Sequence, residues 1–225
     1  SGSAASGAFQ GNAWSLFFQR LFLAAGLLGA LGGLDDVAKR TARRQGEYWL
    51  LLLLCLDGMV LLAGASDLVL LVVSFELMSL PLYVLAAYAK TDVDEEALRT
   101  RASEASLTLF GLALLTGMAG TTRLATLGAA PITPLSAVGL VFVLGGLGYK
   151  IGMVPFHMWV PDTYQGARLP FVAFLSVAPK AAGISVLASI FLFGLGAHRG
   201  HWVPPLAMMA LLSMGVGNLL ALPQT

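Results

Sequence analysis

The chain has 225 residues, of which 57% are hydrophobic and 11% are charged. Soluble proteins carry about 25% charged residues, so this chain cannot build an ordinary water-exposed surface. The formal net charge of +1 excludes a nucleic-acid binder, which needs a dense basic face to neutralise phosphates. The composition therefore predicts a multi-pass membrane protein whose partners are lipids and other membrane proteins.

The opening segment SGSAASGAFQ has no basic residue ahead of an apolar core, so we expect no secretory signal peptide. We also expect natural residues to be missing from both ends. The single cysteine, Cys55, cannot form an intrachain disulfide and is interpreted as a small apolar helix residue.

Seven segments are long and apolar enough to span a membrane. A hydrocarbon core of about 30 Å needs about 20 apolar residues in a helix that rises about 1.5 Å per residue. The predicted spans are 13–34, 48–66, 67–89, 103–120, 135–154, 170–197 and 203–222. The sequence thus predicts an all-α transmembrane helix bundle, organised as a single domain over residues 1–225.

The basic residues predict the orientation of these spans. If the N-terminus lies outside, eight Lys and Arg fall on one side of the membrane and two on the other. Cytoplasmic loops carry the excess of Lys and Arg, so the side with eight is expected to be cytoplasmic. The eight are Lys39, Arg40, Arg43, Arg44, Lys90, Arg99, Arg101 and Arg168, and the two are Arg123 and Arg199.

Four ionisable residues lie well inside the predicted spans, namely Arg20, Asp57, Glu76 and Lys180. A charge at the bilayer centre costs about 3 kcal/mol on insertion scales, so each is a candidate functional residue with a partner in the bundle. Glu76 lies near the membrane centre, ahead of Pro81, which is expected to bend the helix. A structural ion pair is the alternative for Glu76, and mutual neutralisation is the favoured interpretation of Arg20 and Asp57.

Further polar residues lie in and after the segment GGLGYKIGMVPFHMWVPD. Glycines precede Lys150 and two prolines follow it, so we expect a helix that breaks near this lysine, beside protein or water. Burial disfavours a charged lysine and a nearby carboxylate favours it, which makes Lys150 a candidate proton-exchange site. His157 could relay protons, and Lys180 lies among small residues that allow close packing. The alternatives are a Lys150 that reaches the interface and a His157 bonded to backbone.

No motif predicts a self-contained enzyme. His198 and His201 share a loop without a further ligand at metal-binding spacing. The segment GGLGYK lies in an apolar span without the strand that a phosphate-binding loop requires. We therefore expect no catalytic residue, cofactor or metal in this chain.

Three stretches carry a family resemblance: SFELMSLPLYVLAAYAK, GLGYKIGMVPFHMWVPDTYQGARLPFVAFLSVAPKAAG and GNLLALPQT. The chain resembles subunit N of the proton-pumping NADH:quinone oxidoreductase, respiratory complex I, over essentially its whole length. The pattern PFHxWxPDxYQG followed by FLSVxPKAAG separates subunit N from the related subunits L and M. This family has an antiporter-like fold of fourteen helices with two inverted repeats and a broken helix in each, and this chain resembles helices three to nine.

The resemblance implies a proton-translocating subunit driven by quinone chemistry elsewhere in the complex. By matching positions, Glu76, Lys150, His157 and Lys180 are the expected proton-transfer residues. NADH, FMN, iron–sulfur clusters and quinone are expected in partner subunits, and the neighbours are expected to be antiporter-like and small membrane subunits. The expected location is the bacterial inner membrane.

The residues and the resemblance together favour a switch formed by Glu76 and Lys150. An opposite charge about 4 Å away contributes about 4 kcal/mol at an effective dielectric near 20. We expect Lys150 to stay charged while Glu76 is close and to release its proton along His157 and Lys180 when the glutamate turns away.

Two positions depart from the family. Thr108 stands where the family has a lysine, four residues after Glu104, and Asp57 stands where the family has a small or apolar residue. We treat Asp57, Glu104, Thr108 and Arg20 as possible modulators. A subunit of a multi-subunit sodium/proton antiporter and a non-pumping scaffold remain alternatives, although the YQG and SVAPKAAG segments argue against the antiporter.

Overall fold

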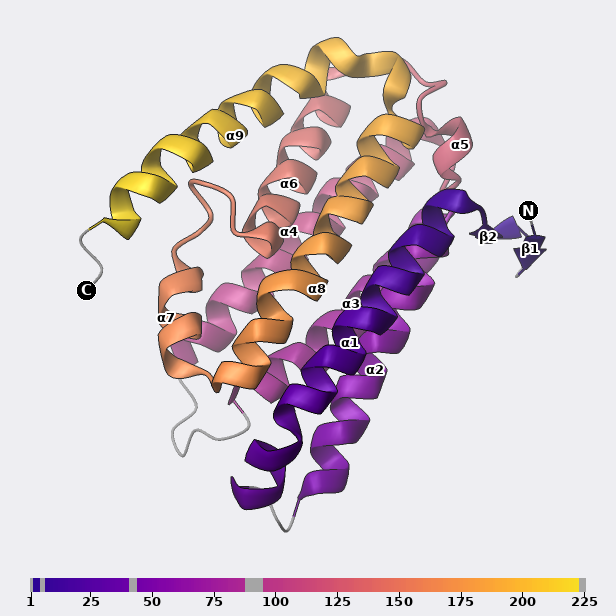
Figure 1. Cartoon of the computed structure of the whole chain (residues 1–225). Helices are drawn as coiled ribbons and strands as arrows, with labels where there is room; N and C mark the ends of the chain where they lie inside the picture. Colours follow the sequence, from indigo (N-terminus) through magenta and orange to yellow (C-terminus); the bar gives the residue numbers. More distant parts are fainter. Residues whose placement is uncertain (1, 5–6, 41–43, 88–94, 223–225) are drawn as a thin grey trace. The chain divides into compact units, whose positions relative to one another are not determined.

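The computed structural model shows a helical protein that begins with a short two-stranded ribbon (Figure 1). The backbone is described over residues 2–4, 7–40, 44–87 and 95–222, and side chains over 7–39, 44–86, 105–165 and 167–222. The expected all-α transmembrane class is confirmed. The elements are β1 (Gly2–Ala4), β2 (Phe9–Gly11), α1 (Ala13–Arg40), α2 (Gln45–Gly64), α3 (Leu68–Ala87), α4 (Glu95–Ala119), α5 (Leu124–Leu127), α6 (Pro134–Ile151), α7 (Trp159–Gly166), α8 (Leu169–Ala188), the π-helix η2 (Ser189–Gly194), the 3-10 helix η3 (Gly196–His198) and α9 (Arg199–Ala221).

Six helices of the described chain are long and apolar enough to cross a membrane, one for each of six expected spans. They run over Ala13–Lys39, Gln45–Gly64, Leu68–Ala86, Pro134–Ile151, Leu169–Gly194 and Gly196–Ala221. The expected span 103–120 is helical within α4, but its apolar part is the shorter stretch Ala105–Ala119. Fifteen residues reach about 22 Å at about 1.5 Å per residue, which is less than a hydrocarbon core of about 30 Å.

The helices form two compact units. The first contains Ser1–Glu95 and Pro161–Val186, and the second contains Glu96–Val160 and Leu187–Thr225. The first unit therefore holds α1, α2, α3 and most of α7 and α8, and the second holds α4, α5, α6, η2, η3 and α9. The single domain over residues 1–225 stays a prediction.

Helices of the first unit approach closely at glycines. An added Cβ at Gly58 of α2 would lie 2.8 Å from the Cα of Met78 in α3, so the two backbones touch. An added Cβ at Gly29 of α1 would lie 3.1 Å from the Cβ of Phe174 in α8. Helices in lipid associate through this kind of contact, because lipid tails compete with any purely apolar attraction.

A partly buried ion pair joins the end of α1 to the start of α8. Nη1 of Arg168 donates to Oδ2 of Asp36 at 3.2 Å, and the two side chains are 19% and 24% exposed. Removing one partner of a desolvated pair leaves a charge without compensation, which costs more than breaking an exposed pair such as Asp35 with Lys39. The contact agrees with the expectation that Arg168 and the end of the first span lie on the same side of the membrane.

The N-terminal ribbon is anchored to the turn between α2 and α3. β1 and β2 pair antiparallel with Ala4 opposite Phe9. The ring of Phe9 covers Gly64, and Oγ of Ser66 donates to the carbonyl of Ala8 at 2.9 Å. These contacts fix the point at which the chain enters α1.

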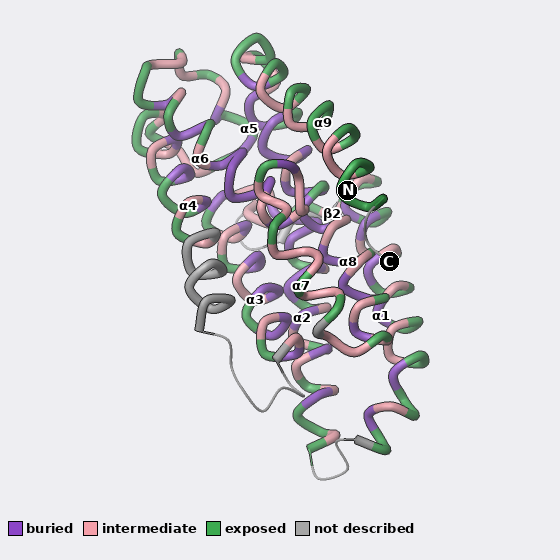
Figure 2. Tube along the Cα trace, turned by 90° about the vertical axis from the view of Figure 1, so that its left-hand side faces the viewer, coloured by how far each residue is buried: buried purple, intermediate pink, exposed green. Residues whose placement is uncertain are grey.

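In the second unit, α4 and α6 also meet at glycines. An added Cβ at Gly111 of α4 would lie 2.8 Å from the carbonyl oxygen of Gly139 in α6. The last turn before η3 widens into the π-helix η2, where Leu195 N–H donates to the carbonyl of Ile190 at 2.8 Å. Nε1 of Trp202 then donates to the carbonyl of Leu195 at 3.0 Å, which anchors α9 while most of that helix is exposed (Figure 2).

The contact at Gly58 yields a test of this packing. Because a methyl group there meets the backbone of α3 and neither backbone can yield, Gly58→Ala is expected to destabilise the protein by about 1–3 kcal/mol. The matched control is Gly32→Ala on α1, where an added Cβ meets nothing within 4 Å. The control is expected to be neutral or stabilising by up to about 1 kcal/mol. Thermal unfolding in detergent measures both, and equal midpoints would contradict the contact.

Candidate functional site

Lys150 is the charged residue in the buried core of the described chain. Its side chain is 6% exposed and lies in the last turn of α6. The carbonyl end of a helix favours a cation, whereas removal from water disfavours one. The burial argues against a lysine that extends to the membrane interface. The proton-exchange role of Lys150 stays a prediction.

The expected helix break beside Lys150 is confirmed. α6 ends at Ile151 and α7 begins at Trp159. Gly152 has φ of +81°, a conformation that favours glycine, and its N–H donates to the carbonyl of Gly148 at 2.9 Å. This is the usual way in which a glycine ends a helix and satisfies its last carbonyls.

Two contacts hold the break in place. The N–H of Val154 donates to Oγ of Ser213 in α9 at 2.9 Å. Nε1 of Trp159 donates to the carbonyl oxygen of Tyr149 at 2.7 Å, and the two rings stack with centroids 5.9 Å apart. The residue that precedes Lys150 is therefore fixed by the start of α7.

Thr108, one of the possible modulators, packs against α6 about one turn before Lys150. It is 4% exposed and lies against Gly146, where an added Cβ would be 3.0 Å from the Cβ of Thr108. Positions 146 and 150 are four residues apart and share a helix face. The side chain of Glu104 lies outside the described residues, so its role stays a prediction.

His157 lies in the break and is half-buried. Its Nδ1 is buried and has no hydrogen-bond partner among the described residues, so the alternative of a backbone bond is not observed there. A buried polar atom left unpaired costs about 1–3 kcal/mol unless water completes it. Among the described side chains, no group of three or more His, Cys, Asp or Glu could hold a metal ion.

Glu76 lies on α3 in the first unit and is half-buried. Ser74, half a turn earlier, is fully buried, and its hydroxyl has no hydrogen-bond partner in the described part of the chain. Pro81 lies inside α3 and has no N–H, so the carbonyl of Leu77 loses its helical donor. α3 therefore carries polar groups around Glu76 that the helix itself does not satisfy.

Lys180 lies on α8 in the same unit, where the sequence places it. Its Nζ lies over the ring of Tyr164 in α7, 5.3 Å from the ring centroid. In the described chain it has no carboxylate within 4.0 Å. Tyr164 was not among the residues expected from the sequence, although it lies in the segment PDTYQG, which carries the family resemblance.

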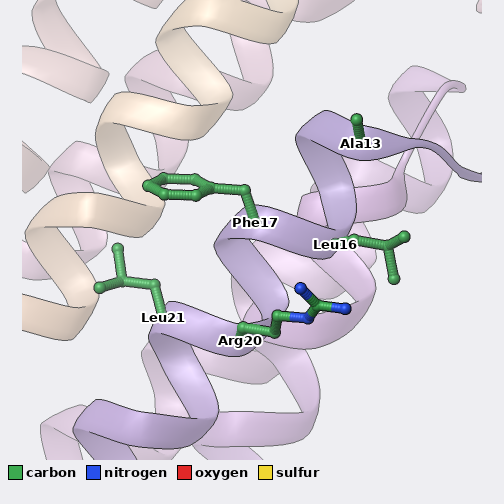
Figure 3. A pocket seen from close by; sticks show the side chains of 5 residues that line it. All are labelled: Ala13, Leu16, Phe17, Arg20 and Leu21. Carbon is green, nitrogen blue, oxygen red and sulfur yellow. The ribbon is translucent and has the colours of Figure 1, made fainter.

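Arg20 and Asp57 are exposed residues on α1 and α2. Nε2 of Gln19 donates to the carbonyl of Val60 at 3.2 Å, which confirms that these helices are neighbours at this level. The two charges do not form an ion pair with each other in the described structure, so their expected neutralisation is wrong. Arg20 instead lines a surface hollow of about 490 Å³ (Figure 3), together with Ala13, Leu16, Phe17 and Leu21.

Comparisons with known proteins agree with this architecture. Residues 65–225 match the family described as NADH:quinone oxidoreductase/Mrp antiporter, TM. The chain is 38% identical over 220 residues to NADH-quinone oxidoreductase subunit N of Heliobacterium modesticaldum, covering 94% of this chain and 46% of that protein. It is 42% identical over 196 residues to NAD(P)H-quinone oxidoreductase subunit 2 of Prochlorococcus marinus, covering 84% of this chain and 38% of that protein. The chain thus spans less than half the length of these relatives.

Solved structures show the same fold. A chain of respiratory complex I from Thermus thermophilus with bound aureothin superposes with a TM-score of 0.77 and 34% identity, covering 98% of this chain and 48% of that chain. A chain of the Mrp complex from a Dietzia species gives a TM-score of 0.66 and 25% identity, covering 80% of this chain and 35% of that chain.

The contact between Thr108 and Gly146 can be tested by a double-mutant cycle. Gly146→Ala places a methyl group against Thr108 and is expected to destabilise the protein by about 1–3 kcal/mol. Thr108→Ala removes the hydroxyl and the methyl group that crowd this position, so it should recover part of the loss in the Gly146→Ala background. Thermal unfolding in detergent of the two single variants and the double variant measures the coupling. Strictly additive changes would show that the side chains do not meet.

Proposed function

Because the chain belongs to the NADH:quinone oxidoreductase/Mrp antiporter transmembrane family, we propose that it is a proton-translocating membrane subunit of a proton-pumping NADH:quinone oxidoreductase. The observation that carries the proposal is Lys150, a 6% exposed lysine at the end of a broken membrane helix. Intramembrane ionisable residues are costly and mark ion and proton pathways. A helix break at membrane depth supplies polar backbone groups around such a site.

Lys150 acts in this proposal as the group that takes up and releases the proton. Lysine can change its charge when it is buried and its surroundings change, whereas arginine keeps its proton. His157 follows in the break and carries a buried ring nitrogen that no described residue satisfies. Such an atom is free to form a hydrogen bond to water, through which a proton could pass.

Glu76 and Lys180 are the proposed proton-transfer groups of the first unit. Around Glu76, the buried hydroxyl of Ser74 supplies a further polar group without a described partner. Lys180 is half-buried and has no carboxylate within 4.0 Å in the described chain. Each residue can therefore respond to a charge that moves nearby, which is the property that a proton relay needs.

In this proposal the chain itself carries no redox centre. NADH, FMN, iron–sulfur clusters and quinone belong to partner subunits in this proposal, and the energy for proton transfer comes from quinone reduction there. The partners are other antiporter-like and small membrane subunits of the complex. The bacterial relatives support a location in the bacterial inner membrane.

A subunit of a multi-subunit sodium/proton antiporter is the second candidate. The structural likeness to the Mrp complex favours it, but the identity there is 25%, against 34% for the complex I chain. Co-purification with flavin-containing and iron–sulfur subunits supports the oxidoreductase. Sodium-driven proton exchange without those subunits supports the antiporter.

Substitution of Lys150 tests the proposed role. In the complete complex reconstituted into vesicles, Lys150→Met and Lys150→Arg are each expected to lower NADH-driven proton uptake by about tenfold or more. Methionine cannot carry the proton and arginine cannot release it. Glu76→Gln is expected to act in the same direction, because it removes a charge that can respond to the lysine.

The matched control is Lys39→Met, since Lys39 is exposed and pairs with Asp35 on the surface of α1. This variant is expected to pump normally. Assembly of every variant is checked by the yield of intact complex. An assembled Lys150→Arg complex that pumps at the wild-type rate would contradict the assignment of Lys150.

A further inference from the structure

Tyr164 and Lys180 form a contact between two helices of the first unit. Nζ of Lys180 lies 5.3 Å from the centroid of the Tyr164 ring. An ammonium group over an aromatic face within about 6 Å is attracted by the negative face of the ring. The contact joins α7 to α8, and both residues are half-buried.

The contact has a direction along the membrane axis. Lys180 lies eleven residues after Leu169, where α8 begins, which is about 16 Å at about 1.5 Å per residue. Side chains of a helix lean toward its N-terminus, so the ammonium group points toward the start of α8. Tyr164 belongs to α7, which ends at Gly166, just before α8 begins at Leu169.

No stronger partner competes with the ring in the described chain. Lys180 has no carboxylate within 4.0 Å among the described residues. Pro179 and Ala182 beside it are buried, and Gly183 one position further is buried as well. Among the described residues, the ring of Tyr164 is therefore the one group in contact with Nζ of Lys180 that attracts its charge. An apolar surface would not attract it.

The hydroxyl of Tyr164 forms no hydrogen bond between helices in the described part of the chain. It is buried and makes no hydrogen bond to any described residue. A tyrosine retained for helix packing would be expected to use its hydroxyl, because an unpaired buried hydroxyl costs free energy. The aromatic face is the part of the Tyr164 side chain that makes a polar contact in the structure, with Nζ of Lys180.

We propose that Tyr164 is a positioning residue that holds the ammonium group of Lys180 over its ring, on the side of the membrane where α8 begins. The inference rests on the proposed function, because it takes Lys180 as a proton-transfer group. The ring attracts the ammonium form of the lysine and has much less attraction for a neutral amine. Tyr164 thus holds Lys180 in one orientation, from which it would pass its proton to the next group of the proposed path.

The experiment compares variants of Tyr164 that lose either the aromatic ring or the hydroxyl group. It uses the complete complex reconstituted into vesicles. Tyr164→Leu removes the aromatic face and is expected to lower NADH-driven proton uptake roughly two- to thirtyfold, the range of a cation–π contact. Tyr164→Phe keeps the face and is expected to restore most of the uptake. Pentafluorophenylalanine at position 164 has the shape of phenylalanine but an electron-poor face, so it should behave like the leucine variant.

Phe17→Leu is the control for loss of an aromatic ring, because Phe17 is 62% exposed in the same unit and its described ring contact is with Phe18. It is expected to pump normally. Equal uptake by the phenylalanine and pentafluorophenylalanine variants would show that only the shape of the ring matters, and would overturn the proposal. So would normal uptake by Tyr164→Leu.

Lys150→Met in the same assay separates a failure of the proposed function from a failure of the positioning role of Tyr164. Normal pumping by Lys150→Met would overturn the proposed function itself. Normal pumping by Tyr164→Leu beside an inactive Lys150→Met would overturn only the positioning role of Tyr164.

Discussion

A broken helix inside a membrane can persist only if its free backbone groups find partners within the protein, because lipid offers none. The break after α6 meets this constraint. Gly152 and Met153 donate to the carbonyl of Gly148 at 2.9 and 2.7 Å, and Val154 donates to Ser213 of α9 at 2.9 Å. Lys150 lies one turn of helix from these contacts. The burial of Lys150 therefore depends on hydrogen bonds that the backbone of the break forms with residues of α6 and α9.

Close helix approach is the second condition for burying polar groups. Gly111 and Gly139 bring α4 and α6 into backbone contact, and Gly146 lets Thr108 lie where a Cβ would otherwise be. In the first unit, Gly58 brings α2 against the backbone of Ser74 and Met78 in α3, on either side of Glu76 in the chain. Such approach excludes lipid from the sides of the polar residues. Polar residues in such a setting are shielded from lipid by neighbouring helices, which lowers the cost of keeping them in the membrane.

Two buried polar atoms without a hydrogen-bond partner among the described residues lie close in the chain to residues proposed to move protons. Ser74 precedes Glu76 on α3, and Nδ1 of His157 lies in the break that follows Lys150. The ring of Tyr164 adds a surface that attracts a cation without accepting its proton. The two buried polar atoms can form hydrogen bonds to water, and the ring can hold an ammonium group without a carboxylate partner.

The sequence by itself determined the membrane class, six of the spans and the helix break, because apolar run length and the glycines and prolines around Lys150 act locally. It also placed Glu76, Lys150, His157 and Lys180 through motifs that the family shares. It could not decide side-chain environments. Arg20 and Asp57 lie at similar depth but do not pair, since their orientation is set by how α1 packs on α2. The contact of Tyr164 with Lys180 likewise depends on where the turn between α7 and α8 brings two residues that are distant in sequence.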